Sequence, residues 1–309
     1  MIQGNGSGLN SKDSVVRQNS FKAWFLAARP KTLAAGATPV IVASALAFHD
    51  GSFRGLPALI CLVFAVSAQI ISNFANDYFD YIKGSDNQER LGPKRAVAEG
   101  WIAPKRMLFV TLVLCILNSV LGLTLLFYGG WYLIPVGVAV VVFALAYSGG
   151  PYPLAYRGWG DVCVFVFFGI VPIGFTYYVQ TGQWTLSATV CGMAVGLVVI
   201  NILVANNYRD RFTDAAAGKN TTIVLFGERF GRCFYLLNGG VAVLCCQYFW
   251  FERAVWASVF PMIYLVFHIM TWRKMVRIGS GKELIVVLEQ SARNVLIFGL
   301  ALSIGLILK

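Results

Sequence analysis

The sequence predicts an all-α, polytopic membrane protein with about nine transmembrane helices, and three observations support this fold class. The first is composition: hydrophobic residues make up 58% of the 309 residues, and charged residues only 13%. A soluble domain of this length would carry roughly twice that charged fraction. The mean hydropathy of +0.68 points in the same direction.

The second observation is a series of apolar runs with lengths suited to a hydrocarbon core about 30 Å thick. These runs lie near residues 32–48, 55–79, 107–128, 131–148, 161–180, 185–208, 233–250, 254–271 and 291–308. Some neighbouring runs are separated by only a few residues, so a count of eight is also compatible with the pattern.

The third observation is the distribution of positive charge. When the Lys and Arg residues are sorted by alternate loops, 22 of the 25 fall on one side, and only Arg54, Arg253 and Lys309 on the other. The positive-inside rule then predicts a cytoplasmic N-terminus and an external C-terminus for nine helices in the cytoplasmic (inner) membrane. Because topology explains the net charge of +11, we expect no nucleic-acid partner.

The domain organisation follows from these segments. Residues 1–19 are polar and rich in Gly, Ser and Asn, and are predicted to form a disordered tail. Residues 20–31 mix basic and bulky apolar side chains, which is typical of a helix lying in the membrane interface. Residues 20–309 are predicted to form a single transmembrane domain, with two four-helix pseudo-repeats and a final helix.

A first acidic motif follows the second apolar run. Asn73, Asn76, Asp77 and Asp80 are spaced three and four residues apart, which puts them on one face of a helix. A polar loop with Asp86, Arg90, Lys94 and Arg95 comes next. Carboxylate and amide oxygens suit Mg²⁺, and a neighbouring basic cluster suits phosphate. Taken alone, the motif would fit equally well a helix end with solvated charges.

A second motif of the same pattern follows the sixth run and changes this balance. The segment NNYRD (206–210) aligns with NDYFD (76–80), so that Asn206 corresponds to Asn76 and Asp210 to Asp80. Asp214 lies one helical turn further on, and Lys219 follows in the loop. Two like motifs on the cytoplasmic ends of different helices indicate an internal parallel repeat whose halves face one site. Together they predict a metal–diphosphate clamp.

The segment between the fourth and fifth runs, YSGGPYPLAYRGWGD (147–161), is rich in aromatic residues. An aromatic girdle at the membrane interface explains Tyr147, Tyr152, Tyr156 and Trp159 without any role in a site. Arg157, however, would suit an anionic ligand, and a Tyr side chain such as Tyr147 would stabilise a carbocation through its ring face. Both readings are open at this point. His268, near a helix end, is expected to be structural.

These residues are compatible with one chemistry in particular. Divalent ions would bridge the carboxylates to a diphosphate, and apolar helices would enclose a long lipid tail. Metal ions and cations would stabilise charge on departing pyrophosphate, while burial would keep water from the allylic cation. No His/Ser/Asp or Cys/His arrangement indicates acyl transfer instead.

The motifs, with their spacing and common side, resemble those of the UbiA-type intramembrane prenyltransferases. The similarity extends over most of the chain and is carried by AARPKTL (27–33), NDYFDYIKGSD (76–86), RLGPKRAV (90–97), GGPYPLAYRGWGD (149–161) and NNYRDRFTDAAAGKNT (206–221). The resemblance implies nine helices around a central cavity, Mg²⁺ dependence and a polyprenyl diphosphate donor. The branch it resembles most uses 1,4-dihydroxy-2-naphthoate as acceptor and replaces its carboxylate, with loss of CO₂.

The same resemblance implies roles for particular residues. Asp77, Asp80 and Asp86 would hold one Mg²⁺, and Asp210 and Asp214 a second, although Asp86 stands six rather than four positions after the second acid. The candidate catalytic residues are Asp77, Asp80, Asp210, Asp214 and Lys219. The candidate substrate-binding residues are Asn73, Asn76, Arg90, Lys94, Arg95, Tyr147, Arg157 and Asn206.

Two alternatives remain at this stage. The acceptor of such an enzyme could be 4-hydroxybenzoate, homogentisate or haem. A cation-coupled transporter would also carry acidic residues, but transport favours polar groups near mid-membrane and an inverted repeat. The sequence leaves the prenyl chain length, the base that deprotonates the acceptor and the oligomeric state open.

Overall fold

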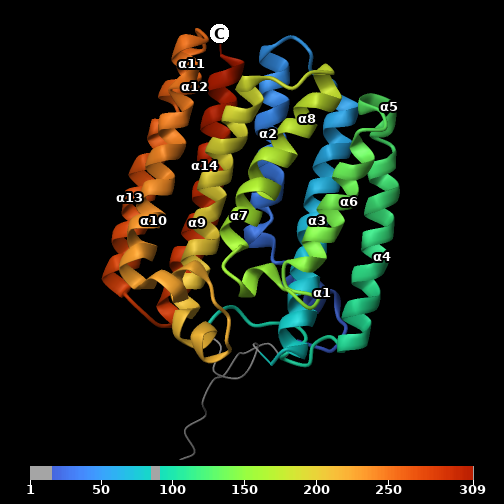
Figure 1. Cartoon of the computed structure of the whole chain (residues 1–309), viewed down its shortest axis with the longest axis vertical. Coiled ribbons are helices and arrows are strands. Elements are labelled where there is room, and N and C mark those ends of the chain that lie inside the picture. The colour runs from blue at the N-terminus through green and yellow to red at the C-terminus, as the bar shows by residue number, and fades with distance from the viewer. Residues whose placement is uncertain (1–15, 85–90, 309) are drawn as a thin grey trace, which may run out of the picture.

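The computed structural model describes residues 16–84 and 91–308, and the described residues form a bundle of helices without β-strands (Figure 1). The α-helices are α1 (Phe21–Ala28), α2 (Ala34–His49), α3 (Gly55–Ile82), α4 (Pro104–Leu123), α5 (Leu126–Gly129), α6 (Leu133–Ala146), α7 (Gly160–Phe165), α8 (Val171–Thr181), α9 (Leu186–Ala216), α10 (Thr222–Cys246), α11 (Tyr248–Phe251), α12 (Val255–Val259), α13 (Met262–Ile278) and α14 (Ile285–Ile307). Short 3₁₀ segments are η1 (Pro30–Thr32), η2 (Leu154–Tyr156) and η4 (Lys282–Leu284), and η3 (Val166–Ile170) is a π-helix.

These helices confirm the all-α membrane class predicted from the sequence. Seven helical segments in the described part of the chain are long and apolar enough to cross a membrane, and the bent pair 21–32 and 34–49 raises this number to eight. Each of the nine apolar runs contains one of these segments or the 14-residue helix α6, which is shorter than a full span. The count of nine and the orientation in the membrane therefore stay predictions.

Helix α9 lies in the interior and is buried over most of its length. The segment α7–η3–α8 packs against it closely, because Gly169 faces Gly192 and Gly196 without intervening side chains. A Cβ on Gly169 would lie 2.5 Å from the carbonyl oxygen of Gly192. Small residues allow this backbone approach, as in other membrane helix pairs.

The predicted interfacial segment is helical. Ser20 caps α1 by accepting a hydrogen bond from the N–H of Ala23. Phe21 and Phe25 are exposed, whereas Ala23 and Ala27 are buried against the bundle. This outward apolar face suits the membrane interface. Residues 1–15 of the predicted tail lie outside the described residues, and the N–H of Asn19 donates to the carbonyl of Trp101.

Helices α3 and α9 bring the two acidic motifs to the same end of the bundle. Both are long, with 28 and 31 residues, and each carries its motif in its C-terminal turns. This is the end at which α1 lies, opposite to the C-terminus (Figure 1). The fold thus creates one polar end where the sequence predicts the site.

Candidate active site

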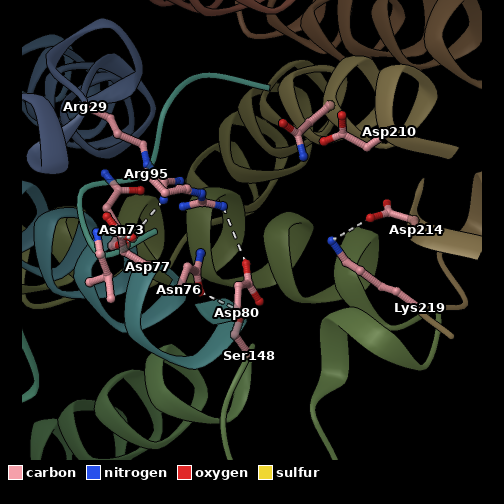
Figure 2. Close-up of polar contacts among 12 residues, drawn as sticks. Arg29, Asn73, Asn76, Asp77, Asp80, Arg95, Ser148, Asp210, Asp214 and Lys219 are labelled. Atoms are coloured by element: carbon pink, nitrogen blue, oxygen red, sulfur yellow. Dashed lines mark hydrogen bonds and ion pairs between the residues drawn. The ribbon is translucent and has the colours of Figure 1, made fainter. Parts of the chain in front are cut away.

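The two acidic motifs face each other across the polar end of the bundle. In Figure 2, Asp77 and Asp80 of α3 lie on one side, and Asp210 and Asp214 of α9 on the other. All four carboxylates are buried, with exposed fractions of 9% or less. Buried carboxylates require partners, since an unpaired buried charge is strongly destabilising.

In the first motif, Asp77 accepts hydrogen bonds from two backbone N–H groups. Its Oδ2 accepts a hydrogen bond from the N–H of Ala96 at 3.0 Å, and its Oδ1 accepts one from the N–H of Val97 at 3.2 Å. The carboxylate therefore ties the segment after the polar loop to α3. Asp80 pairs with Arg95, whose Nη2 lies 3.4 Å from Oδ2.

The two asparagines of the first motif also have defined partners. Asn73 donates to the carbonyl of Ala28 at 2.9 Å and accepts from Gln69 at 3.3 Å, so it connects α1 to α3. The Oδ1 of Asn76 accepts a hydrogen bond of 2.7 Å from the hydroxyl of Ser148. Both asparagines line the cavity described below.

In the second motif, each carboxylate is paired with a cation from its own neighbourhood. Arg209 binds both oxygens of Asp210, and its Nη2 also donates to Asn206. The ammonium of Lys219 lies 3.5 Å from Oδ1 of Asp214. The sequence analysis predicted Lys219 but missed Arg209.

Tyr156 connects the two motifs and was not selected from the sequence. Its hydroxyl donates to Oδ1 of Asp80 at 3.1 Å. Lys83, which follows the first motif, lies 4.7 Å from the ring centroid, and Lys219, which follows the second, lies 5.6 Å from it. The carbonyl of Tyr156 accepts from the N–H of Asn220. Partial burial lowers the pKa of Lys83, and the charge of Asp80 opposes this shift.

The predicted cations differ in position. Arg95 is buried (8% exposed) and lines the cavity. The side chain of Lys94 also lines it but is 68% exposed and lies 3.4 Å from Glu99. Arg157 stacks on Tyr152, 5.0 Å from the ring centroid, and is not among the described residues that line the cavity. Asp86 and Arg90 lie outside the described residues.

A cavity of about 1020 Å³ leads from the polar end into the bundle. Its wall near the motifs includes Asp80, Arg95 and Lys219, while the carboxylates of the other three acids are set back from it. The rest of the wall is largely apolar and aromatic, contributed by α2, α3, α6, α7–α8 and α9, and includes Phe64, Phe143, Phe167, Phe168 and Phe175. A charged head and a long apolar tail would both find suitable surroundings here.

Tyr147 lies on the cavity wall. Burial raises the pKa of its phenol, and the nearby negative charge of Asp161 raises it further. The side chain is therefore a neutral phenol at the cavity wall.

The residues present have the donor chemistry that Mg²⁺ requires. Carboxylate and amide oxygens of α3 and α9 are hard ligands, and each oxygen of Asp80 accepts one hydrogen bond and so retains a further lone pair. Over the described ranges, however, no three acidic, His or Cys side chains lie close enough together to hold one ion. The predicted set of Asp77, Asp80 and Asp86 is only partly described.

Comparisons with known proteins identify relatives in both sequence and fold. A 1,4-dihydroxy-2-naphthoate octaprenyltransferase of Haemophilus influenzae is 36% identical over 240 residues, which cover 72% of this chain and 75% of that protein. The Mycobacterium tuberculosis protein of the same name is 34% identical over 287 residues, covering 92% and 96%. Among solved structures, a UbiA homolog from Archaeoglobus fulgidus bound to GPP and Mg²⁺ has a TM-score of 0.63 and 13% identity, covering 91% of this chain and 99% of that one.

The structural similarity establishes a shared fold, and the sequence similarity goes further. The model of the UbiA prenyltransferase family matches residues 37–283, which is most of the chain. The chain belongs to the UbiA prenyltransferase family.

Proposed function

We propose that this protein transfers a polyprenyl group from polyprenyl diphosphate to 1,4-dihydroxy-2-naphthoate, a step of menaquinone biosynthesis. The observation that carries the proposal is the cavity, in which carboxylates and cations at one end adjoin a long apolar wall. The curated relatives that share about a third of the sequence are octaprenyltransferases for this acceptor.

The cations on the cavity wall would bind the diphosphate of the donor. Arg95 pairs with Asp80 of the first motif, and Lys219 pairs with Asp214 of the second. A diphosphate bound between the two cations would therefore contact both halves of the site. Lys94 is exposed and would contribute mainly to attraction of the anion from solution. When bound, Mg²⁺ would neutralise charge on the departing pyrophosphate. Asp80, Asp77, Asp210 and Asp214 are the described carboxylates that would hold it, with two ions proposed.

The apolar wall would hold the prenyl chain and protect the reacting carbon. As the bond between the allylic carbon and diphosphate oxygen breaks, positive charge develops on that carbon. The ring of Tyr147 would stabilise this charge and its neutral hydroxyl would not compete as a nucleophile. The new C–C bond forms at the acceptor carbon that bears the carboxylate, and CO₂ and pyrophosphate leave. The product is the hydroquinone form of demethylmenaquinone, and its conversion to the quinone would be a separate, later oxidation.

We further propose that the protein lies in the cytoplasmic membrane with this site facing the cytoplasm. The polar end carries the basic loops that the positive-inside rule assigns to the cytoplasm. The hydrophilic parts of the two substrates are the diphosphate and the naphthoate carboxylate, and both would then enter from the cytoplasmic side. The prenyl chain would stay in the apolar cavity.

The test is an assay of the purified protein in liposomes with 1,4-dihydroxy-2-naphthoate and a polyprenyl diphosphate, with Mg²⁺ or with EDTA. The expected result is a prenylated, decarboxylated product detected by mass spectrometry only when Mg²⁺ is present. Prenylation of 4-hydroxybenzoate instead would contradict the acceptor but support the donor site. Absence of product with every acceptor would contradict prenyl transfer itself.

A further inference from the structure

Arg209 is the most deeply buried charged residue in the described part of the site, and the roles assigned so far leave it out. Its side chain is 0% exposed, although Arg is almost never fully buried unless it is paired. Its Nε donates to Oδ1 of Asp210 at 2.8 Å, and its Nη2 donates to Oδ2 at 2.6 Å. The two form a bidentate ion pair, the strongest geometry for an Arg–carboxylate contact.

This pair is not a consequence of helix geometry. Side chains of adjacent helical residues point about 100° apart and do not face each other. Arg209 must therefore fold its side chain back along α9 to reach Asp210. On the way its Nη2 also donates to Oδ1 of Asn206, at 2.7 Å. One guanidinium thus fixes two residues of the second motif, of which Asn206 lines the cavity.

The third nitrogen of the Arg209 guanidinium differs from the other two. Its Nη1 is buried and has no hydrogen-bond partner within residues 16–84 and 91–308. Leaving a buried donor unsatisfied is unfavourable, by about 1–3 kcal/mol. Nη1 takes no part in the contacts to Asp210 and Asn206, which are made by Nε and Nη2.

We propose that Arg209 is a positioning residue that holds the carboxylate of Asp210 and the amide of Asn206 in the orientation needed for a divalent cation. The guanidinium occupies one lone pair on each oxygen of Asp210 and leaves the other available to the ion. Because Arg209 itself does not line the cavity, it acts through these two residues. This inference rests on the proposed metal-dependent function. Removal of such supporting groups weakens metal binding by about 10–100-fold in other proteins.

The chain offers a matched control two residues further along the same helix. Arg211 is also buried, at 8% exposed, and its guanidinium donates to the carbonyls of Tyr208 and Gly279 and to Glu228. Glu228 and Gly279 lie outside the acidic motifs, and the contact with Tyr208 is to its backbone carbonyl only. Arg211→Lys should therefore disturb packing between α9, α10 and α13 without changing the metal site.

The experiment measures Mn²⁺ binding to the purified full chain by EPR, in the presence of an unreactive thiolo analogue of geranyl diphosphate. Arg209→Lys keeps the charge but cannot form the two-point contact. It should weaken Mn²⁺ binding about tenfold and shift the Mg²⁺ dependence of turnover by the same factor, while kcat at saturating Mg²⁺ largely recovers. Asn206→Ala, which leaves the ion pair intact, should weaken binding less, and it replaces Arg209→Lys if that variant does not fold.

Arg211→Lys should bind Mn²⁺ like the wild-type chain, even if its thermal stability falls. Equal Mn²⁺ affinity of Arg209→Lys and the wild type would overturn the positioning role while leaving the proposed function intact. Equal loss in Arg209→Lys and Arg211→Lys would reduce Arg209 to a packing residue. A wild-type chain that binds no Mn²⁺ would overturn both this inference and the metal-dependent function.

Discussion

The hydroxyl of Tyr156 donates a hydrogen bond to the carboxylate of Asp80, and the ammonium groups of Lys83 and Lys219 both lie close to the ring of the same tyrosine. One side chain therefore contacts the first acidic motif and the lysines that follow both motifs. The loop that carries Tyr156 connects α6 to α7 and belongs to neither motif. It brings the two halves of the site into a fixed relation.

Tyr156→Phe should lower kcat/KM about tenfold. The substitution keeps the ring near the two lysines but removes a hydrogen bond to a buried carboxylate, which is worth about 1.5–3 kcal/mol. The measurement is steady-state kinetics with varied donor. Tyr152→Phe is the control, because that ring is 54% exposed and stacks on Arg157 away from the cavity wall. Equal effects of the two substitutions would contradict the specific role of Tyr156.

Arg95 and Lys94 should differ in their effect on the donor. Arg95 is buried, pairs with Asp80 and lines the cavity, whereas Lys94 is largely exposed and screened by solvent. Arg95→Ala should raise the KM for polyprenyl diphosphate by at least about tenfold, and Lys94→Ala by about threefold or less. The KM for the acceptor should change little in either variant. A larger rise in the donor KM for Lys94→Ala than for Arg95→Ala would contradict the assignment of Arg95 as the stronger diphosphate-binding cation.

Asp77→Asn should loosen the segment that carries these cations. The carboxylate accepts hydrogen bonds from the N–H groups of Ala96 and Val97, and an amide has only one oxygen to replace them. The free energy of unfolding should fall by about 1–3 kcal/mol, and the KM for the donor should rise. Thermal unfolding in detergent and donor kinetics measure the two effects. A change in Mg²⁺ dependence at unchanged stability would show instead that Asp77 acts only at the metal.

Composition and the lengths of the apolar runs were sufficient to predict the fold class, because the thickness of the hydrocarbon core sets the length of an apolar helix that spans it. The internal break of the fifth apolar run could not be predicted in this way. The π-helix between α7 and α8 occurs where Gly169 meets Gly192 and Gly196 of α9, which lie more than twenty residues away in sequence. Such a contact depends on tertiary packing, and the hydrophobic pattern contains no signal for it.

The candidate site, like the fold, was predictable from the sequence only in part. Spacing of three and four residues grouped Asp77 with Asp80 and Asp210 with Asp214, and each pair lies on one side of the polar end (Figure 2), since helical periodicity alone fixes those faces. The pair of Arg209 and Asp210 runs against that periodicity and was missed. Tyr156 contacts Asp80 and Lys219, which are 76 and 63 positions away in the sequence. The sequence therefore indicated an aromatic cluster without showing which member contacts the motifs.

The pH dependence of turnover should show no ionisation of Tyr147. Burial and the charge of Asp161 raise its pKa, so the phenol stays neutral throughout about pH 6 to 9. The stability that the neutral phenol contributes to the folded state is fully present below pH 10.0, the ordinary pKa of a tyrosine. It is lost only as the pH rises further, toward the raised pKa of Tyr147. Because Phe keeps the aromatic ring, Tyr147→Phe should change kcat little and leave the pH–rate profile unchanged. An ionisation that disappears in Tyr147→Phe would contradict this.

His268 should contribute to stability and not to catalysis. Its Nε2 faces the carbonyl of Leu236 at 3.2 Å and must carry the proton, so Nδ1 accepts from the hydroxyl of Tyr264 at 3.0 Å. The imidazole is also stacked between Tyr235 and Tyr264, with centroids 5.0 and 5.1 Å away. His268→Ala would leave a cavity and two unsatisfied groups among α10 and α13. We expect a loss of about 2–4 kcal/mol in thermal unfolding.

Activity per folded molecule of His268→Ala should remain close to that of the wild type at a temperature well below unfolding, because the ring does not line the cavity in the described structure. His49→Ala is the control, since that histidine is only half-buried and its Nδ1 contacts a single carbonyl, that of Leu306. It should lose less stability than His268→Ala. A selective loss of kcat in His268→Ala, with unfolding unchanged, would indicate that the polar network reaches the reaction site.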